Sequence, residues 1–228
     1  MKSEIVRMSC SYGASTYTIE TDLRKSPYYG KIPSVMHPKY LPYYSTVDDP
    51  VVIDIANQLN EQLSGRRDYI KITVLLAFVQ QNIRYCSDDE RFGKDVWESP
   101  IYTLRERVAD CDGMATLYTS IAYNMGLDVV SVIVTGHMCS GVNAAGCHGK
   151  KYDYNGKTYY HVETTDILPA VGRYWDGFTK QLFIEPPLTP TEEFRKLMVS
   201  YLATDDDPNT DDNHKSYLPS KQKPEKNT

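Results

Sequence analysis

Three segments in the first half of the chain carry apolar residues at helical spacing. The first follows Asp49, a candidate N-cap, and Pro50, which suits the first position of a helix. The third follows Asp110 and ends at Gly126, a natural C-terminal cap. Its apolar residues recur at intervals of three and four positions: Met114, Leu117, Tyr118, Ile121, Ala122 and Met125. The pattern predicts helices over about 50–63, 68–83 and 111–125, with a short element, IYTLRER, before the last.

Strand patterns replace helical spacing after residue 126. The β-branched run LDVVSVIVTG predicts a buried strand, and HMCSGVN predicts a second one beginning at His137. Asn155-Gly156 lies between two tyrosine-rich segments and is the strongest short hairpin signal. Helices come first and a run of antiparallel strands follows, so the sequence predicts an α+β fold.

The two ends of the chain differ from this centre. Residues 1–47 are rich in tyrosine and proline, as in KSPYYGKIPSVMHPKYLPYYS, and are predicted to form an extended or turn-rich arm that packs on the domain. A flap that covers a substrate is the alternative. Residues 203–228 have almost nothing to bury and are predicted to be a disordered polar tail, although their acidic cluster and lysines could dock a partner. The central domain is predicted to span 48–202.

Composition limits the classes of function. The net charge is -5, so nucleic acid is not an expected partner. No apolar run approaches the length of a membrane span, and the first residues lack the apolar region of a signal peptide. The five cysteines are odd in number and scattered, which argues against a disulfide framework. We therefore expect a cytoplasmic protein that does not contact a membrane.

Cys111 occupies the predicted start of a helix, directly after Asp110. A helix N-terminus carries unsatisfied N–H groups and a partial positive charge, both of which favour a thiolate over a thiol. The same N–H groups can hold the oxyanion that forms when a carbonyl is attacked. Position alone leaves two interpretations open: a nucleophile, or a small buried apolar side chain.

A catalytic cysteine needs a histidine base and a group that orients the imidazole. Three of the five histidines lie in unpromising segments: His37 in the arm, His148 in a glycine-flanked loop and His214 in the tail. His137 and His161 remain. Strand alternation places His161 and Glu163 on one face of the last strand, and an antiparallel neighbour beginning at His137 could set that imidazole beside Glu163.

One long stretch resembles the transglutaminase-like superfamily of papain-fold thiol enzymes. It comprises VQQNIRYCSDDE, DVWESPIYTLRERVADCDGMATLYTSIAYNMGLDVVSVIVTGHMCSGV and YNGKTYYHVETT. Members show an aromatic residue at the end of a helix, a Trp–Pro segment followed by TL, DC opening a helix, GH opening a strand and a late acidic-x-Thr. All occur here in this order within residues 48–166. The resemblance implies a papain-like core in which the nucleophile helix packs on an antiparallel sheet.

The resemblance also implies roles for individual residues. Cys111 matches the nucleophile, His137 in TGHM matches the general base, and Glu163 in VETT falls at the orienting acid, which is more often Asp. His161 is the rival base. It lies two residues from Glu163 on the same strand, about 6–7 Å along it, which favours His137 as the partner. The alternative role for His161 is a partly exposed sheet residue.

Other positions carry weaker implications. Trp97 or Tyr102 could line the site, as aromatics before the cysteine often do in relatives. Gly113 departs from the family, where many members carry an acidic residue. Cys111, Cys139, Cys147 and His148 are a conceivable zinc set. They lack paired C-x-x-C spacing, so no metal or cofactor is expected.

A thiol triad of this kind attacks a carbonyl and forms an acyl-enzyme. Water as the acceptor gives hydrolysis of an amide or peptide bond. We expect this reaction because the sequence shows no feature that would bind a second amine. An amine as the acceptor gives a transglutaminase-type transferase. Members without catalysis serve as binding modules, and the fold does not decide among these. The expected partner is a peptide or protein substrate.

Overall fold

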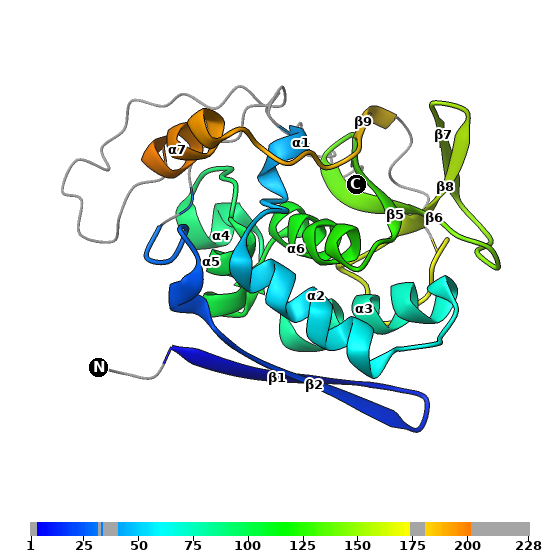
Figure 1. The fold of residues 1–228 in the computed structure, drawn as a ribbon. Helices are drawn as coiled ribbons and strands as arrows, with labels where there is room; N and C mark the ends of the chain where they lie inside the picture. The colour runs from blue at the N-terminus through cyan, green and yellow to red at the C-terminus, as the bar shows by residue number, and fades with distance from the viewer. Residues whose placement is uncertain (1–3, 32, 34–40, 174–180, 202–228) are drawn as a thin grey trace, which may run out of the picture.

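The computed structural model describes residues 4–31, 33, 41–173 and 181–201. Helix α6 (Cys111–Asn124) lies at the centre of the fold, between α2 (Pro50–Gln62) and α3 (Asp68–Asn82) on one side and strands β5 and β6 on the other (Figure 1). This position explains why every side chain from Asp112 to Ala122 is buried.

The predicted helices form close to the expected bounds. The Asp49 carboxylate accepts hydrogen bonds from the first N–H groups of α2, and Pro50 is its first residue. Ser99 caps α5 (Pro100–Glu106) in the same way. The segment before α5 contains a further short helix, α4 (Asp88–Phe92), which ends at Gly93 in the left-handed conformation.

The antiparallel sheet follows α6 in the chain, and together with the helices it makes the α+β fold that the sequence predicts. Its strand order is β7-β8-β6-β5-β9. The tight turn between β7 and β8 uses positive φ angles at Asn155 and Gly156, as the hairpin signal predicts. The bounds are β5 (Asp128–Val134), β6 (His137–Asn143), β7 (Lys151–Tyr154), β8 (Lys157–Val162) and β9 (Gln181–Glu185).

The sheet has two apolar faces. Met138, Val142 and Val162 join the main core with α6. The opposite face carries a second, smaller cluster that includes Cys139 and Tyr152. Alternation along β6 and β8 therefore separates the side chains that hold α6 from Cys139 and His161, which lie with Tyr152.

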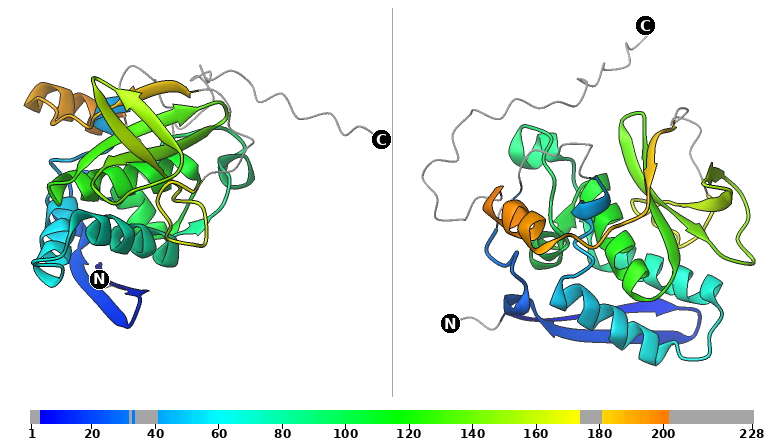
Figure 2. Two further views of the ribbon diagram at one scale, coloured as in Figure 1. Left: turned by 90° about the vertical axis from the view of Figure 1, so that its right-hand side faces the viewer. Right: turned by 45° about the horizontal axis from the view of Figure 1, so that its top comes forward.

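The N-terminal segment forms a β-hairpin that the sequence did not specify. Strands β1 (Ile5–Tyr12) and β2 (Ser15–Asp22) pair in antiparallel register and pack on α3 and α2, on the side away from the sheet (Figure 2). Met8, Cys10 and Ile19 enter the main core. The hairpin leads into the 3-10 turn η1 (Leu23–Lys25), and α1 (Leu41–Tyr44) follows later, while residues 34–40 lie outside the described part.

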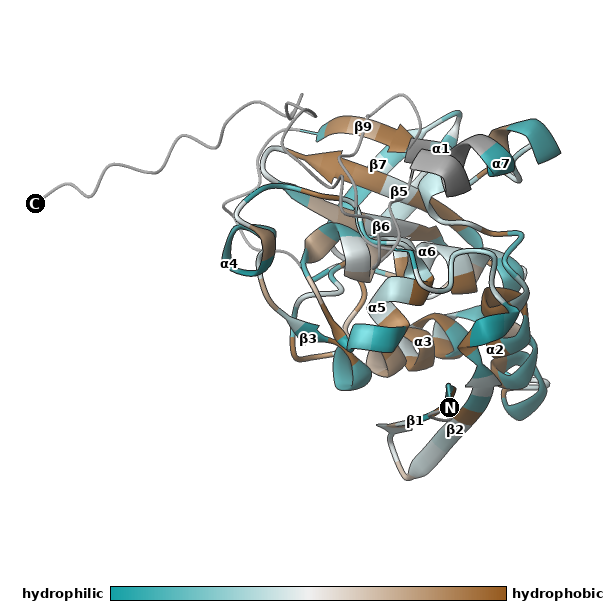
Figure 3. Cartoon of the chain, turned by 90° about the vertical axis from the view of Figure 1, so that its left-hand side faces the viewer, coloured by the Kyte–Doolittle hydropathy of each residue, from teal (hydrophilic) through white to brown (hydrophobic). Residues whose placement is uncertain are grey.

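Two further elements were not predicted: β9 at the sheet edge and α7 (Glu192–Tyr201) after it. The hydropathy colouring shows β9 as apolar and much of α7 as hydrophilic (Figure 3). Leu182 and Phe183 of β9 are exposed. Among the described helices, none has the length and apolar character needed to cross a membrane. The tail predicted at 203–228 lies outside the described residues.

Candidate active site

Cys111 is the first residue of α6, as predicted, and Asp110 is the N-cap. Two short strands hold this end of the helix: β3 (Arg84–Tyr85) and β4 (Val108–Ala109) pair in parallel, which ties the residues before Cys111 to the end of α3. The Cys111 side chain is partly buried, and its Sγ lies 3.8 Å from Asp110 Oδ2.

The Asp110 cap engages N–H groups that were expected to receive an oxyanion. Asp110 Oδ1 accepts from Asp112 N at 2.9 Å and from Gly113 N at 3.3 Å. These two amides are therefore taken up in holding the helix start, as an N-cap requires. These two amides are not open donors for an oxyanion, because a capping carboxylate competes for the same groups.

Tyr85 lies near Cys111, although no role was expected for it. Burial first, and then the nearby negative charge of Cys111 and Asp110, raises the pKa of Tyr85 to about 12. The hydroxyl therefore keeps its proton at neutral pH. Tyr85 closes the IRY run at the end of α3, which is the aromatic signpost of the family resemblance and the signal that could have identified it.

A buried acidic cluster surrounds the start of α6. Carboxylate oxygens of Asp88, Glu98 and Asp110 lie within 4.8 Å of one another, as do those of Asp95, Asp110 and Asp112. Arg91 pairs with Glu98. Among the described residues, these two groups are the ones that could hold a metal ion, and both consist of carboxylates, the ligands preferred by hard cations. The sequence pattern did not predict the cluster, although SDDE, KDVWES and DCD contain its members.

Mutual repulsion and burial keep protons on this cluster. Burial first, and then the charge of Asp110, raises the pKa of Asp88 to about 7. Burial likewise raises the pKa of Glu98 to about 8, although Arg91 opposes the change. Burial and the neighbouring Asp110 also raise the pKa of Asp112 well above its ordinary value. The cluster is consequently only partly ionised near neutral pH.

Gly113 has a steric explanation. A Cβ atom at this position would lie 2.7 Å from Glu98 Oε2, 2.8 Å from the Ala109 Cβ and 3.2 Å from Thr103 Oγ1. No side chain fits there while Glu98 occupies its present place.

His137 and Glu163 meet as the sequence predicted. His137 begins β6 after Gly136, which turns the chain with a φ of 70°. Its Nε2 lies 2.8 Å from Glu163 Oε2, and both side chains are buried. The other carboxylate oxygen, Oε1, accepts from the Thr165 N–H at 3.0 Å and from the Thr165 hydroxyl at 2.7 Å. Gln80 of α3 donates to the Glu163 backbone carbonyl at 2.9 Å.

The environment of Glu163 favours its ionised form. Burial alone would raise its pKa, but hydrogen bonds from His137 and His161, and then from Thr165, outweigh burial and hold the pKa well below its usual range. An ionised carboxylate can only accept hydrogen bonds from its neighbours. It therefore fixes a proton on His137 Nε2 and leaves Nδ1 as the basic nitrogen.

The prediction that His161 is partly exposed is wrong. Its exposed fraction is 0%, and its Nε2 lies 3.4 Å from Glu163 Oε2. The separation along a strand refers to backbone positions, and side chains two residues apart on one face can lean together. His161 therefore contacts the same carboxylate oxygen as His137.

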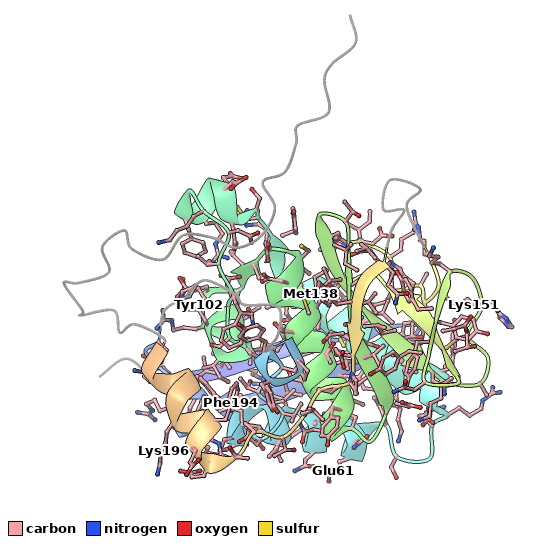
Figure 4. The ribbon with its side chains drawn as sticks, turned by 90° about the horizontal axis from the view of Figure 1, so that it is seen from above. Glu61, Tyr102, Met138, Lys151, Phe194 and Lys196 are labelled. Carbon is pink, nitrogen blue, oxygen red and sulfur yellow. The ribbon has the colours of Figure 1, made fainter. Side chains whose placement is uncertain are left out.

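The two aromatics expected to line the site pack against other side chains. Trp97 is buried and packs against Tyr44, with ring centroids 4.6 Å apart. Tyr102 lies on α5, with the Arg105 guanidinium 5.0 Å from its ring centroid. Figure 4 labels Tyr102 and, well apart from it in this view, Met138, the residue after His137.

Comparison with known proteins gives distant likenesses. The sequence matches no family profile and no curated protein. It is similar to the structure of a candidate cysteine protease from Cytophaga hutchinsonii, at 13% identity and a TM-score of 0.42, over 80% of this chain and 67% of that one. A candidate protease from Parabacteroides distasonis ATCC 8503 has 11% identity and a TM-score of 0.36, over 71% of this chain and 39% of that one. Scores this low do not establish a shared fold.

Proposed function

We propose that the protein is a thiol-dependent acyl-transfer enzyme with a papain-like, transglutaminase-like core. Cys111 is the nucleophile, His137 the general base, and Glu163 the acid that orients His137. The reaction that fits this set best is hydrolysis of an amide or peptide bond. The triad takes part in each step without a cofactor.

The pairing of His137 with Glu163 carries the proposal. A base needs one ring nitrogen without a proton, held in a fixed direction. The 2.8 Å contact at Nε2 supplies the fixed direction, and the ionised carboxylate selects the tautomer. Cys111 at the first position of α6 adds a nucleophile where the helix dipole favours a thiolate.

The reaction then proceeds in two halves. The Cys111 sulfur attacks the carbonyl carbon while its proton passes to His137 Nδ1. The C–N bond breaks, and His137 returns that proton to the leaving amine. In the second half His137 removes a proton from water, the water oxygen attacks the thioester carbon, the C–S bond breaks, and the sulfur recovers the proton.

The acidic cluster sets the conditions for this chemistry. Ionised carboxylates beside Cys111 disfavour a second negative charge on sulfur. The raised pKa values of Asp88 and Glu98 keep part of the cluster neutral near pH 7, which lessens this penalty. The positive charge that forms on His137 when the thiol ionises is matched by Glu163.

Peptide digestion tests the proposal directly. A mixed peptide library is incubated with the wild type and with Cys111→Ala, and new amino termini are counted by mass spectrometry. We expect cleavage by the wild type that the variant lacks. A parallel reaction contains a fluorescent primary amine, and its incorporation into peptide without cleavage would indicate a transferase. Binding with neither reaction would contradict the enzyme assignment and favour a binding module.

A further inference from the structure

His161 is a fully buried histidine that links Glu163 to two further side chains. Its Nε2 lies 3.4 Å from Glu163 Oε2, and its Nδ1 lies 2.8 Å from the Tyr152 hydroxyl. The Tyr152 hydroxyl lies in turn 3.7 Å from Cys139 Sγ. A buried imidazole is costly unless its nitrogens have partners. Here one partner is the carboxylate that holds His137.

The chemistry of this row sets the direction of its hydrogen bonds. The ionised Glu163 only accepts, so the His161 Nε2 that faces it carries the proton, and at 3.4 Å the contact is electrostatic because it lacks the geometry of a hydrogen bond. A neutral imidazole then lacks a proton on Nδ1, and this nitrogen accepts from the Tyr152 O–H. Burial raises the pKa of the Cys139 thiol, so its sulfur keeps a proton that it can donate to the Tyr152 oxygen.

The backbone of His161 is fixed as firmly as its side chain. The His161 N–H donates to the Lys150 carbonyl at 2.9 Å, and the His161 carbonyl accepts from the Gly172 N–H at 2.6 Å. The imidazole therefore approaches Glu163 from a rigid strand. The carboxylate is held by the His137 hydrogen bond and the His161 electrostatic contact on Oε2 and by Thr165 on Oε1, which leaves it little freedom to rotate.

We propose that His161 is a positioning residue: it holds the Glu163 carboxylate in the rotamer that accepts the His137 Nε2 proton, and Tyr152 holds His161 in the tautomer that allows this. The inference rests on the proposed function, because His161 acts through Glu163 and His137. It also separates the two histidines: His161 is engaged at both nitrogens inside the sheet and does not serve as the base.

Three variants test the proposal against a matched control. His161→Phe keeps bulk but removes the donor, His161→Gln keeps an N–H near the Nε2 position, and Tyr152→Phe removes one hydroxyl. Tyr154→Phe is the control, because Tyr154 lies on the same strand and bonds Glu185 instead. The readouts are the rate of Cys111 alkylation by iodoacetamide between pH 5 and pH 9 and the imidazole nitrogen signals in NMR spectra.

We expect His161→Phe to slow alkylation at pH 6 by roughly tenfold, the usual effect of losing a partner that orients a functional group. His161→Gln should restore most of the rate. Tyr152→Phe should cost less and shift the His161 signals from a pure Nε2–H tautomer toward a mixture. Tyr154→Phe should match the wild type in both readouts.

A folded His161→Phe protein with the wild-type rate and pH profile would overturn the proposal and reduce His161 to packing. If that variant fails to fold, Tyr152→Phe decides: an unchanged tautomer signal and pH profile would overturn it equally. His137→Ala identifies failure of the proposed function itself. If His137→Ala leaves the rate of Cys111 alkylation unchanged, both the proposed function and this inference are refuted. If His137→Ala slows alkylation and His161→Phe does not, only the inference is refuted.

Discussion

His137 Nε2 lies 2.8 Å from Glu163 Oε2, although the two residues are 26 positions apart in the chain. The antiparallel pairing of β6 with β8 creates this contact. Ser140 lies opposite Val162, the residue directly before Glu163. The candidate base and acid are therefore fixed by the sheet, while the candidate nucleophile is fixed by α6. A buried hydrogen bond of 2.8 Å between Thr119 and Ser140 docks the helix on the sheet.

Glu163→Gln tests the orienting role of the carboxylate. In the wild type one carboxylate oxygen faces two imidazoles and the other accepts hydrogen bonds from the Thr165 N–H and hydroxyl. A glutamine amide cannot replace both oxygens, because one of its two ends carries N–H donors. We expect a folded protein in which alkylation of Cys111 at pH 6 slows by roughly tenfold. Glu61→Gln on α2 is the control (Figure 4). A wild-type rate in Glu163→Gln would contradict the orienting role.

The cap of α6 gives a stability prediction. Asp110→Ala removes the acceptor for Asp112 N and Gly113 N, and the loss of an N-cap costs about 1 kcal/mol. Asp110→Asn keeps an acceptor oxygen and removes a charge from the acidic cluster. In urea denaturation Asp110→Ala should therefore be less stable than Asp110→Asn. Equal stability of the two variants would show that the cap does not hold the helix start.

The acidic cluster predicts how stability depends on pH. The pKa of Asp88 rises from 3.8 to about 7 on folding, so the folded state binds this proton more tightly than the unfolded chain. The resulting stabilisation is complete below the unfolded value and is lost as pH rises to about 7. Asp88→Asn keeps an acceptor for the Val96 N–H and needs no proton.

Urea titrations at pH 5 and pH 8 measure this effect. Asp88→Asn should gain stability relative to the wild type on going from pH 5 to pH 8. The exposed Glu61→Gln should show no such gain. A parallel loss in wild type and Asp88→Asn over this interval would mean that Asp88 carries no raised pKa.

Gly113→Ala should reverse the usual effect of alanine in a helix. Alanine normally stabilises a helix interior by roughly 0.5–1 kcal/mol relative to glycine. Here its Cβ would meet Glu98 Oε2 at 2.7 Å, and overpacking of this kind costs about 1–3 kcal/mol. Asn57→Ala, at an exposed position of α2, should be neutral or slightly stabilising. A rise in thermal stability for Gly113→Ala would refute the crowding.

The elements around the candidate site could be predicted because their signals are local. Asp110 and Gly126 bracket α6, and Asn155-Gly156 sets the β7–β8 hairpin. The acidic cluster could not be predicted, since Asp88 and Glu98 reach the helix start only through tertiary packing. The burial of His161 was missed for a related reason: alternation assigns a residue to a face of the sheet but does not reveal what covers that face.

The N-terminal hairpin illustrates a second limit. Apolar and polar residues alternate along both strands, as in VRMSCSY of β1 and YTIE of β2, but the prolines and tyrosines that follow favoured an extended or turn-rich arm over the whole segment. Alternation indicates a strand but not its partners: Gln58, Gln62 and Gln81 of the helices accept hydrogen bonds from the hairpin backbone across separations of 38 to 70 positions. The predicted boundary between an arm and a central domain at residue 47 remains a prediction, although the hairpin shares the main core.

Alkylation of Cys111 tests the central claim most directly. Cys111 is the one cysteine of the five that is not fully buried, so exposure alone predicts that it reacts first. The pH dependence separates activation from exposure: an ordinary thiol loses roughly 100-fold of its thiolate between pH 8 and pH 6, whereas a thiolate paired with an imidazolium loses little. Intact-mass analysis with iodoacetamide follows the reaction without a known substrate.

The account predicts one fast label at both pH 6 and pH 8 in the wild type, no fast label in Cys111→Ala, and loss of the fast reaction at pH 6 in His137→Ala. Its structural counterpart is a Cys111 sulfur within about 4 Å of His137 Nδ1. An ordinary loss of rate at pH 6 in the wild type, or a rate that His137→Ala leaves unchanged, would contradict the nucleophile–base pair and favour a binding module.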